Sequence, residues 1–114
     1  MKAKFVRQLS FDLALYKCDP PMRFVRYVDG NPCDGEIVES PLVAIFCGQR
    51  IEGMHAAVLH AARETPEDAW NGQWPPGKVG PGAIEMGGDC MPRRFDAKLT
   101  EAEALALAGY EVDA

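Results

Sequence analysis

The stretch from Pro41 to Glu64 constrains the fold more than any other part of the chain. It opens with a short apolar run, Leu42 to Cys47, which is rich in β-branched and aromatic residues and is bounded by Pro41 and Gly48. Such a run is typical of a strand buried on both faces, and proline is tolerated at the first residue of a strand. We therefore predict a central buried strand here.

After Gly48 the spacing of apolar residues changes from that of a strand to that of a helix. At about 100° per residue, most of the apolar side chains, together with His55, fall on one side of a helix. They are Ile51, Met54, His55, Val58, Leu59, Ala61 and Ala62. Gly53 is a weak position in such a helix. The sequence predicts an amphipathic helix over residues 51–64 and a short second one over Thr65 to Asn71.

The two histidines fall on different sides of the predicted helix. His55 lies inside the apolar stripe and His60 lies opposite it. They are five residues apart, so one helix face cannot offer both to a metal ion. A histidine in an apolar stripe needs a hydrogen-bond partner, and its pKa is easily moved. His55 is therefore either a core histidine bonded to a backbone carbonyl or a general base in a pocket.

Length and composition indicate one globular domain over residues 1–114. No run approaches the roughly 18 uninterrupted apolar residues of a membrane span. The first residues lack the unbroken apolar stretch of a signal peptide, because Gln8, Ser10 and Asp12 interrupt it. We expect a cytoplasmic protein with no membrane partner.

The net charge is −5, and it lies entirely in the second half of the chain. Residues 58–114 carry ten acidic and five basic side chains, whereas residues 1–57 carry seven of each. A nucleic-acid-binding surface needs clustered lysine and arginine. We therefore expect no nucleic acid partner, and we expect a protein partner to present a basic face to the acidic half.

The four cysteines, Cys18, Cys33, Cys47 and Cys90, form no C-x-x-C pair. In a cytosolic chain such cysteines are reduced thiols by default. A zinc site built from Cys18, Cys33 and Cys90, with His60 as a fourth ligand, stays open as an alternative, although it lacks the spacing of known zinc modules. We predict no metal and no cofactor.

Helix signals are clearest near the end of the chain. Thr100 and Glu103 form a T-x-x-E capping box, and Gly109 is a ready stop after Ala108. Tyr110 to Val112 then predicts a short edge strand. Other strands are predicted over residues 3–17, 23–28, 36–39 and 83–86. Cys18 to Pro21 are expected to separate the first of these strands from the second.

Together these elements predict an α+β fold. We expect a mostly antiparallel sheet of four to five strands with two main helices packed on one face. Exposed sheet edges invite pairing, so a homodimer through residues 3–17 or through the last strand is an open alternative.

The segment from Gly72 to Gly82 is dense in glycine and proline and is predicted to be irregular. Its glycines lack the spacing of a P-loop or a dinucleotide fingerprint. Trp70 and Trp74 stand at its start. These two tryptophans either form an exposed platform for a peptide or ligand, or fold back over the core.

The best place to look for chemistry is the segment that contains Asp89 and Cys90. Arg93 and Arg94 follow it, and nearby arginines lower the pKa of a thiol. A nucleophilic Cys90, with His55 as base and Asp89 as the orienting group, would make a Cys-His-Asp pocket. Nothing in the sequence shows that the three residues meet.

The leading functional hypothesis is therefore a small acidic protein-interaction module. Mobile genetic elements, phages among them, often encode small acidic inhibitors or regulators of host complexes, including defence systems. Its binding residues would be Trp70, Trp74, Arg93 and Arg94. A small enzyme that uses Cys90, His55 and Asp89 and the zinc module remain the two alternatives, although the sequence favours a protein that is not an enzyme.

Overall fold

The computed structural model describes residues 1–10, 12–28, 31–64, 84–86 and 90–113. Strands dominate this part of the chain. They are β1 (Lys2–Ser10), β2 (Leu13–Val28), β3 (Asn31–Ile51), β4 (Met54–Glu64), β5 (Ile84–Met86), β6 (Arg93–Phe95) and β7 (Glu111–Asp113), with one helix, α1 (Glu101–Leu107), before β7.

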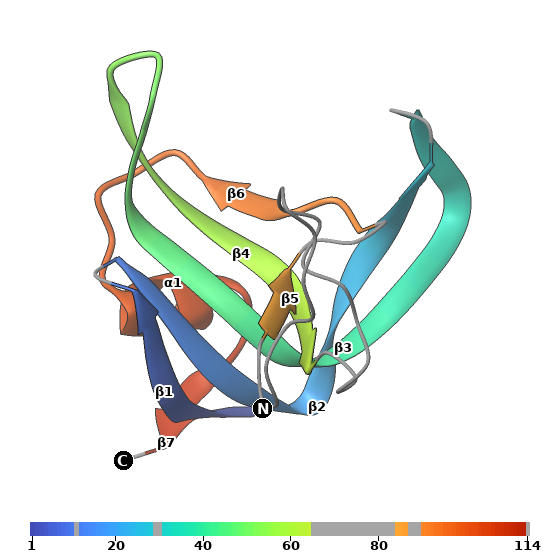
Figure 1. Ribbon diagram of the computed structural model, residues 1–114, viewed down its shortest axis with the longest axis horizontal. Helices are drawn as coiled ribbons and strands as arrows, with labels where there is room; N and C mark the ends of the chain where they lie inside the picture. The colour runs from blue at the N-terminus through green and yellow to red at the C-terminus, as the bar shows by residue number, and fades with distance from the viewer. Residues whose placement is uncertain (11, 29–30, 65–83, 87–89, 114) are drawn as a thin grey trace, which may run out of the picture.

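The strands form one curled sheet with the order β5-β4-β3-β2-β1-β7, and β6 also pairs with β4. All pairs are antiparallel except β1 and β7, which run parallel. The six strands of the main path make a mixed half-barrel, with α1 behind the sheet in the view of Figure 1.

A segment from Cys90 to Phe95 connects two sides of the half-barrel. Cys90 forms a β-bridge with Arg26, and the Met91 amide donates to the Val25 carbonyl at 2.8 Å. Further along, β6 pairs with β4. The outer half of β2 is therefore linked to β4 by this segment as well as through β3 (Figure 1).

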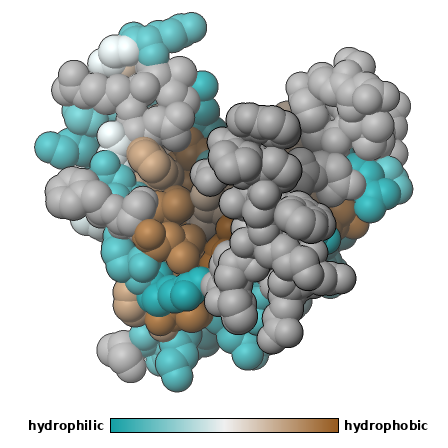
Figure 2. Space-filling view, in the orientation of Figure 1, coloured by the Kyte–Doolittle hydropathy of each residue, from teal (hydrophilic) through white to brown (hydrophobic). Residues whose placement is uncertain are grey.

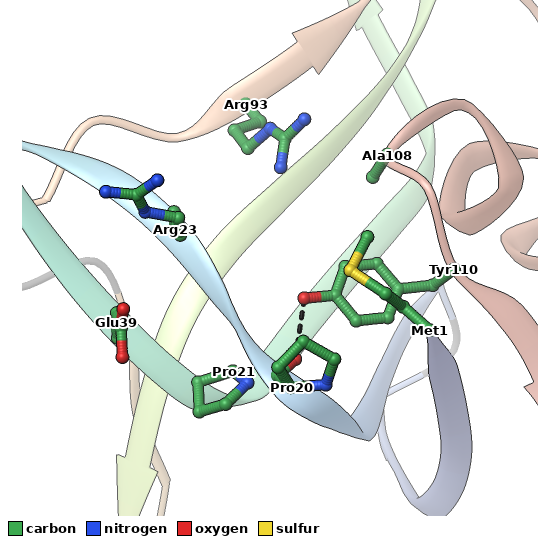
Figure 3. A pocket seen from close by; sticks show the side chains of 8 residues that line it. All are labelled: Met1, Pro20, Pro21, Arg23, Glu39, Arg93, Ala108 and Tyr110. Atoms are coloured by element: carbon green, nitrogen blue, oxygen red, sulfur yellow. Dashed lines mark hydrogen bonds between the residues drawn. The ribbon is translucent and has the colours of Figure 1, made fainter.

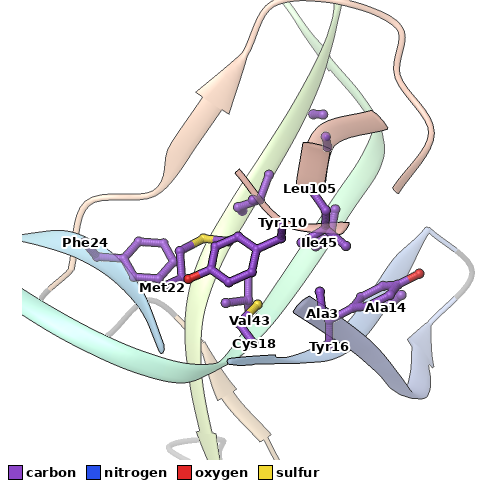
Figure 4. Close-up of a cluster of buried hydrophobic side chains, with 13 residues drawn as sticks. Ala3, Ala14, Tyr16, Cys18, Met22, Phe24, Val43, Ile45, Leu105 and Tyr110 are labelled. Carbon is purple, nitrogen blue, oxygen red and sulfur yellow. The ribbon is translucent and has the colours of Figure 1, made fainter. Parts of the chain in front are cut away.

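The apolar side chains form two clusters, one on each face of the sheet. The larger, which we call the main core, lies on the face covered by α1 (Figure 4). Its members are Ala3, Ala14, Tyr16, Cys18, Met22, Phe24, Val43, Ile45, Ala57, Leu59, Ala104, Leu105 and Tyr110. The second cluster lies on the other face and consists of Leu13, Leu15, Ala44 and Ala62.

The predicted fold class, α+β with two main helices, is wrong. The protein is mostly β, and the described residues contain one short helix. The error lies at residues 51–64, where the predicted helix is a hairpin turn followed by β4. Glu52 and Gly53 both have positive φ, 52° and 81°, and Ile51 pairs with Met54 across them. Positive φ at both central residues is typical of a type I′ turn, which matches the twist of paired strands.

Two predicted boundaries are also wrong. Residues 3–17 are not one strand, because β1 ends at Ser10 and pairs with the start of β2 at Leu13. Residues 18–21 do not break the chain into separate strands, because β2 continues through them to Val28. They form an irregularity inside β2, which the pairing with β3 accommodates by a shift of register.

Several predicted elements are confirmed. The central strand lies within β3, where Val43, Ala44 and Ile45 are fully buried. The predicted strands at 23–28, 36–39 and 83–86 fall within or around β2, β3 and β5, and the edge strand after Tyr110 is β7. The predicted helix at Thr65 to Asn71 and the irregular segment at Gly72 to Gly82 lie outside the described residues.

Helix α1 begins and ends with the predicted signals. The Glu103 amide donates to the Thr100 hydroxyl at 3.2 Å, and the Thr100 amide donates to the Glu103 carboxylate at 3.1 Å, which completes the capping box. At the other end Gly109 has φ +93°, and the Tyr110 amide donates to the Leu105 carbonyl at 2.8 Å. This is a Schellman motif, and it turns the chain sharply into β7.

Replacement of Thr100 by alanine is expected to lower the free energy of unfolding by about 1 kcal/mol, because it removes the oxygen that accepts the Glu103 amide. Urea titration followed by circular dichroism measures the change. Thr100→Ser is the matched control, since it keeps a hydroxyl and should cost much less. Equal losses in the two variants would contradict the role given to the cap.

Candidate functional site

A hollow of about 360 Å³ lies where β2, β3 and β6 meet the turn after α1. We call it the β2–β6 hollow. It is lined by Met1, Pro20, Pro21, Arg23, Glu39, Arg93, Ala108 and Tyr110 (Figure 3). Its volume lies within the roughly 300–1,000 Å³ of small-ligand pockets, towards the lower end.

One wall of the hollow is the irregularity in β2. Lys17 pairs with Leu42 and Met22 pairs with Ser40, so four residues of β2 stand opposite one residue of β3. Pro20 and Pro21 lie in this excess, and the Asp19–Pro20 peptide bond is cis. Proline has no backbone N–H for a sheet ladder, so bulges are among the few places where strands accept it. The two prolines thus explain why β2 carries extra residues opposite β3 at this point.

Next to Pro20 the lining continues with Tyr110, which follows directly after the C-terminal turn of α1 (Figure 3). Its amide closes the Schellman motif, and its ring is 4% exposed in the main core. The phenol donates a hydrogen bond of 2.6 Å to the Pro20 carbonyl. This bond joins two segments 90 residues apart in sequence and holds β2 against the turn after α1 at one side of the hollow.

The environment keeps the Tyr110 phenol protonated. Burial raises its pKa above the usual value of 10.0, and the nearby Cys18, Asp19 and Glu39 raise it further. Arg93 acts in the opposite direction and lowers that pKa. The net effect is upward, so the hydroxyl retains the proton that it donates to Pro20.

The hollow holds two arginines and one carboxylate. Arg23 and Glu39 are direct cross-strand partners on β2 and β3, and they lie together on the left in Figure 3. Arg93 comes from β6, and in the view of Figure 3 it lies between that pair and the group of Met1, Tyr110 and Ala108. Neither Arg23 nor Arg93 forms an ion pair with any side chain in the described part of the chain.

Charge and lining together define what the hollow can bind. It carries one more positive than negative side chain, in a protein whose net charge is −5. Four of its eight lining residues, Met1, Pro20, Pro21 and Ala108, offer apolar surface. Pockets of this kind, apolar with a few placed polar groups, are suited to bind and orient a ligand.

The proposed Cys-His-Asp set is not assembled among the described residues. Phe95 pairs with Ala57 in the β4–β6 ladder, so His55 lies beyond one end of that ladder and Cys90 beyond the other. At about 3.3 Å per residue this separates His55 from Cys90 by on the order of 20 Å along the sheet. Asp89 lies outside the described residues.

The other cysteines are poor candidates for chemistry. Burial raises the pKa of the Cys18 and Cys47 thiols to about 11, so both are protonated at neutral pH. Among the described residues no group of three or more His, Cys, Asp or Glu side chains could hold a metal ion. The Cys33 side chain, a ligand in the zinc hypothesis, is not among those described.

Of the four predicted binding residues, the structure describes Arg93 and Arg94. Arg93 lines the hollow, whereas its neighbour Arg94 is exposed and pairs with Asp96. Trp70 and Trp74 lie outside the described residues. Sequence analysis did not identify Arg23, Glu39 or Tyr110 as site residues. Of the three, only Tyr110 lies beside a sequence signal, the helix stop at Gly109.

His60 is the histidine with a perturbed environment, although it lies away from the hollow. It pairs with Ala44 across β4 and β3, on the face of the second cluster. Burial lowers its pKa from the usual 6.5. The folded state therefore binds this proton more weakly than the unfolded state does.

The expected consequence of His60 burial is a loss of stability in weak acid. As the pH falls below about 6.5, the unfolded state takes up the proton first, so the free energy of unfolding decreases. His60→Gln should remove this part of the decrease between pH 8 and pH 5. The measurement is a series of urea titrations of both proteins across that range, and parallel curves would contradict the expectation.

No protein family model matches this chain, and neither curated proteins nor solved structures gave a significant match. The site is therefore interpreted from its own geometry. No helix in the described part of the chain has the length and apolar character to cross a membrane.

Proposed function

We propose that this protein is a small protein-interaction module that binds a segment of a partner protein in the β2–β6 hollow. The observation that carries the proposal is Arg93, which is half-buried in the hollow and forms no ion pair with any described side chain. A half-buried guanidinium with no ion pair among the described side chains has donors left for an anionic group. A carboxylate supplied by a binding partner would satisfy it.

Arginine suits this role because its guanidinium matches the two oxygens of a carboxylate. Arg23 stands on the same hollow and adds positive charge, while Glu39 opposes it from the neighbouring strand. The apolar walls would contact the aliphatic part of the bound segment. Recognition then combines one charged contact with apolar burial, as interface anchors commonly do.

The decisive test compares two adjacent arginines. Arg93→Gln removes the charge inside the hollow, and Arg94→Gln removes an exposed charge that pairs with Asp96. Wild type and both variants are panned against a display library of random peptides, and binding of the enriched peptides is then measured. We expect Arg93→Gln to lose tenfold or more in affinity, or at least about 1.4 kcal/mol.

Arg94→Gln should bind as the wild type does. Affinity should also fall with added salt, because a partly exposed guanidinium–carboxylate contact is screened. Equal affinity in all three proteins, or an equal loss in both variants, would contradict the proposed site. Thermal unfolding of each variant shows whether a loss of binding reflects a loss of fold.

A further inference from the structure

We infer that the group recognised in the β2–β6 hollow is the free C-terminal carboxylate of the partner chain, preceded by an apolar last side chain. This inference rests on the proposed function and adds the chemistry of the ligand. The observations behind it are the hydrogen bond from Tyr110 to Pro20 at one side of the hollow, the size of the hollow, and its charge.

The hollow suits the end of a chain better than its middle. Its volume of about 360 Å³ is close to the lower limit for small-molecule pockets. The Tyr110 phenol is hydrogen-bonded to the Pro20 carbonyl at 2.6 Å, so no peptide chain can pass between these two residues. An extended segment advances about 3.3 Å per residue and continues in both directions, whereas a chain end can stop inside.

The charge balance points to a ligand with one carboxylate. The protein carries −5 overall, so a strongly acidic segment would be repelled at long range. Inside the hollow Glu39 offsets one of the two arginines. A single carboxylate facing Arg93, with Arg23 as the second cation, is the charge that this arrangement accommodates.

The apolar lining indicates the rest of the ligand. Met1, Pro20 and Ala108 offer aliphatic surface around the position of the charged contact. An apolar last side chain would lie against them. The backbone N–H groups before it could donate to Glu39, which is otherwise unpaired among the described residues. Capture of a terminal carboxylate is an established mode of peptide recognition.

The test uses three peptide probes of equal length, all N-acetylated. The first ends in leucine with a free carboxylate, the second is its C-terminal amide, and the third is an amide with an internal glutamate. All other positions of each peptide are randomised, so each probe is a pool of sequences. Binding to the full chain is followed by amide chemical shifts in NMR and by calorimetry, for wild type, Arg93→Gln, Arg93→Lys and Arg94→Gln.

We expect the free-acid pool to bind at least tenfold more tightly than its amide and to shift the Tyr110 amide resonance. Arg93→Gln should abolish this difference, Arg93→Lys should keep part of it, and Arg94→Gln should keep all of it. Equal binding of the amide or internal-glutamate pools, still dependent on Arg93, would overturn the terminal-carboxylate inference and leave the proposed function standing. Binding of no pool, or binding independent of Arg93, would overturn both.

Discussion

Replacement of Phe24 by alanine is expected to lower the free energy of unfolding by about 3–5 kcal/mol, the usual range for a buried phenylalanine. Phe24 is 2% exposed and is among the largest fully buried side chains of the main core (Figure 4). Natural domains are stable by only about 5–15 kcal/mol, so the variant would be close to unfolding.

The size of this effect follows from where Phe24 lies. It is on the outer half of β2, where the partner strand is β3 and the register pairs it with Val38. Among the described side chains in that half of β2, Met22 and Phe24 reach the main core. Truncation of Phe24 leaves a cavity where the outer half meets the rest of the half-barrel, and a β-sheet relaxes only partly into such a cavity.

Val25→Ala is the matched control for Phe24→Ala, because Val25 is the next residue and is 38% exposed. Its change should stay within about 1 kcal/mol, since exposed substitutions seldom cost more. Both are measured by urea unfolding, with circular dichroism as the probe. If Val25→Ala costs as much as Phe24→Ala, the outer half of β2 is not held by the main core.

The most serious sequence error, the helix at 51–64, has a definite physical cause. Strand β4 pairs with β3 along one edge and with the short strands β5 and β6 along the other, and both of its faces are covered: Ala57 and Leu59 enter the main core, and Ala62 enters the second cluster. Residues 56–59 are all buried, and a strand buried on both faces shows no alternation of apolar and polar residues. A continuous apolar run of this kind is compatible with a helix or a strand, and the alanines in it favour helix by propensity.

The sequence did predict what local chemistry determines. Thr100, Glu103 and Gly109 form contacts within a few residues of themselves, and the structure confirms both ends of α1. The missed signal at Glu52 and Gly53 is also local, because glycine at the second central position of a two-residue turn is a hairpin signal. If that glycine is interpreted as part of a hairpin turn, the sequence predicts a strand after it in place of the helix.

The β2–β6 hollow was beyond sequence analysis because it depends on register. Pro20, Arg93 and Tyr110 come together for two reasons. Strand β2 has several extra residues opposite β3 at this point, and β6 pairs with β4. No periodicity in the chain encodes either event. The sequence points to Arg93 only through its place after Cys90, and the structure puts it in the hollow with Arg23, some seventy residues earlier in the sequence.

Leu105→Ala is the second large expected effect, with a loss of about 2–5 kcal/mol in the free energy of unfolding. Leu105 is fully buried and, with Ala104, is the part of α1 that reaches the main core. The helix has seven residues, and helices shorter than about 12 residues are marginal in water without tertiary packing. Its stability therefore depends on this contact.

Other contacts limit what the Leu105 variant can lose. The Tyr16 phenol donates to the Glu101 carboxylate at 2.7 Å, and both caps of α1 are intact in Leu105→Ala because they use backbone atoms and the side chains of Thr100 and Glu103. The variant should then lose packing without losing the helix. Circular dichroism of the folded variant should retain the helical signal while the urea midpoint falls.

Leu107→Ala tests whether burial, and not helix composition, sets the loss in Leu105→Ala. Leu107 lies two residues further along α1 and is 60% exposed, so its replacement should change the free energy of unfolding by about 0.5 kcal/mol or less. A large loss for Leu105 and a small one for Leu107 would show that α1 is held by the main core. Small losses in both would mean that the contact of Leu105 with the main core contributes little to stability.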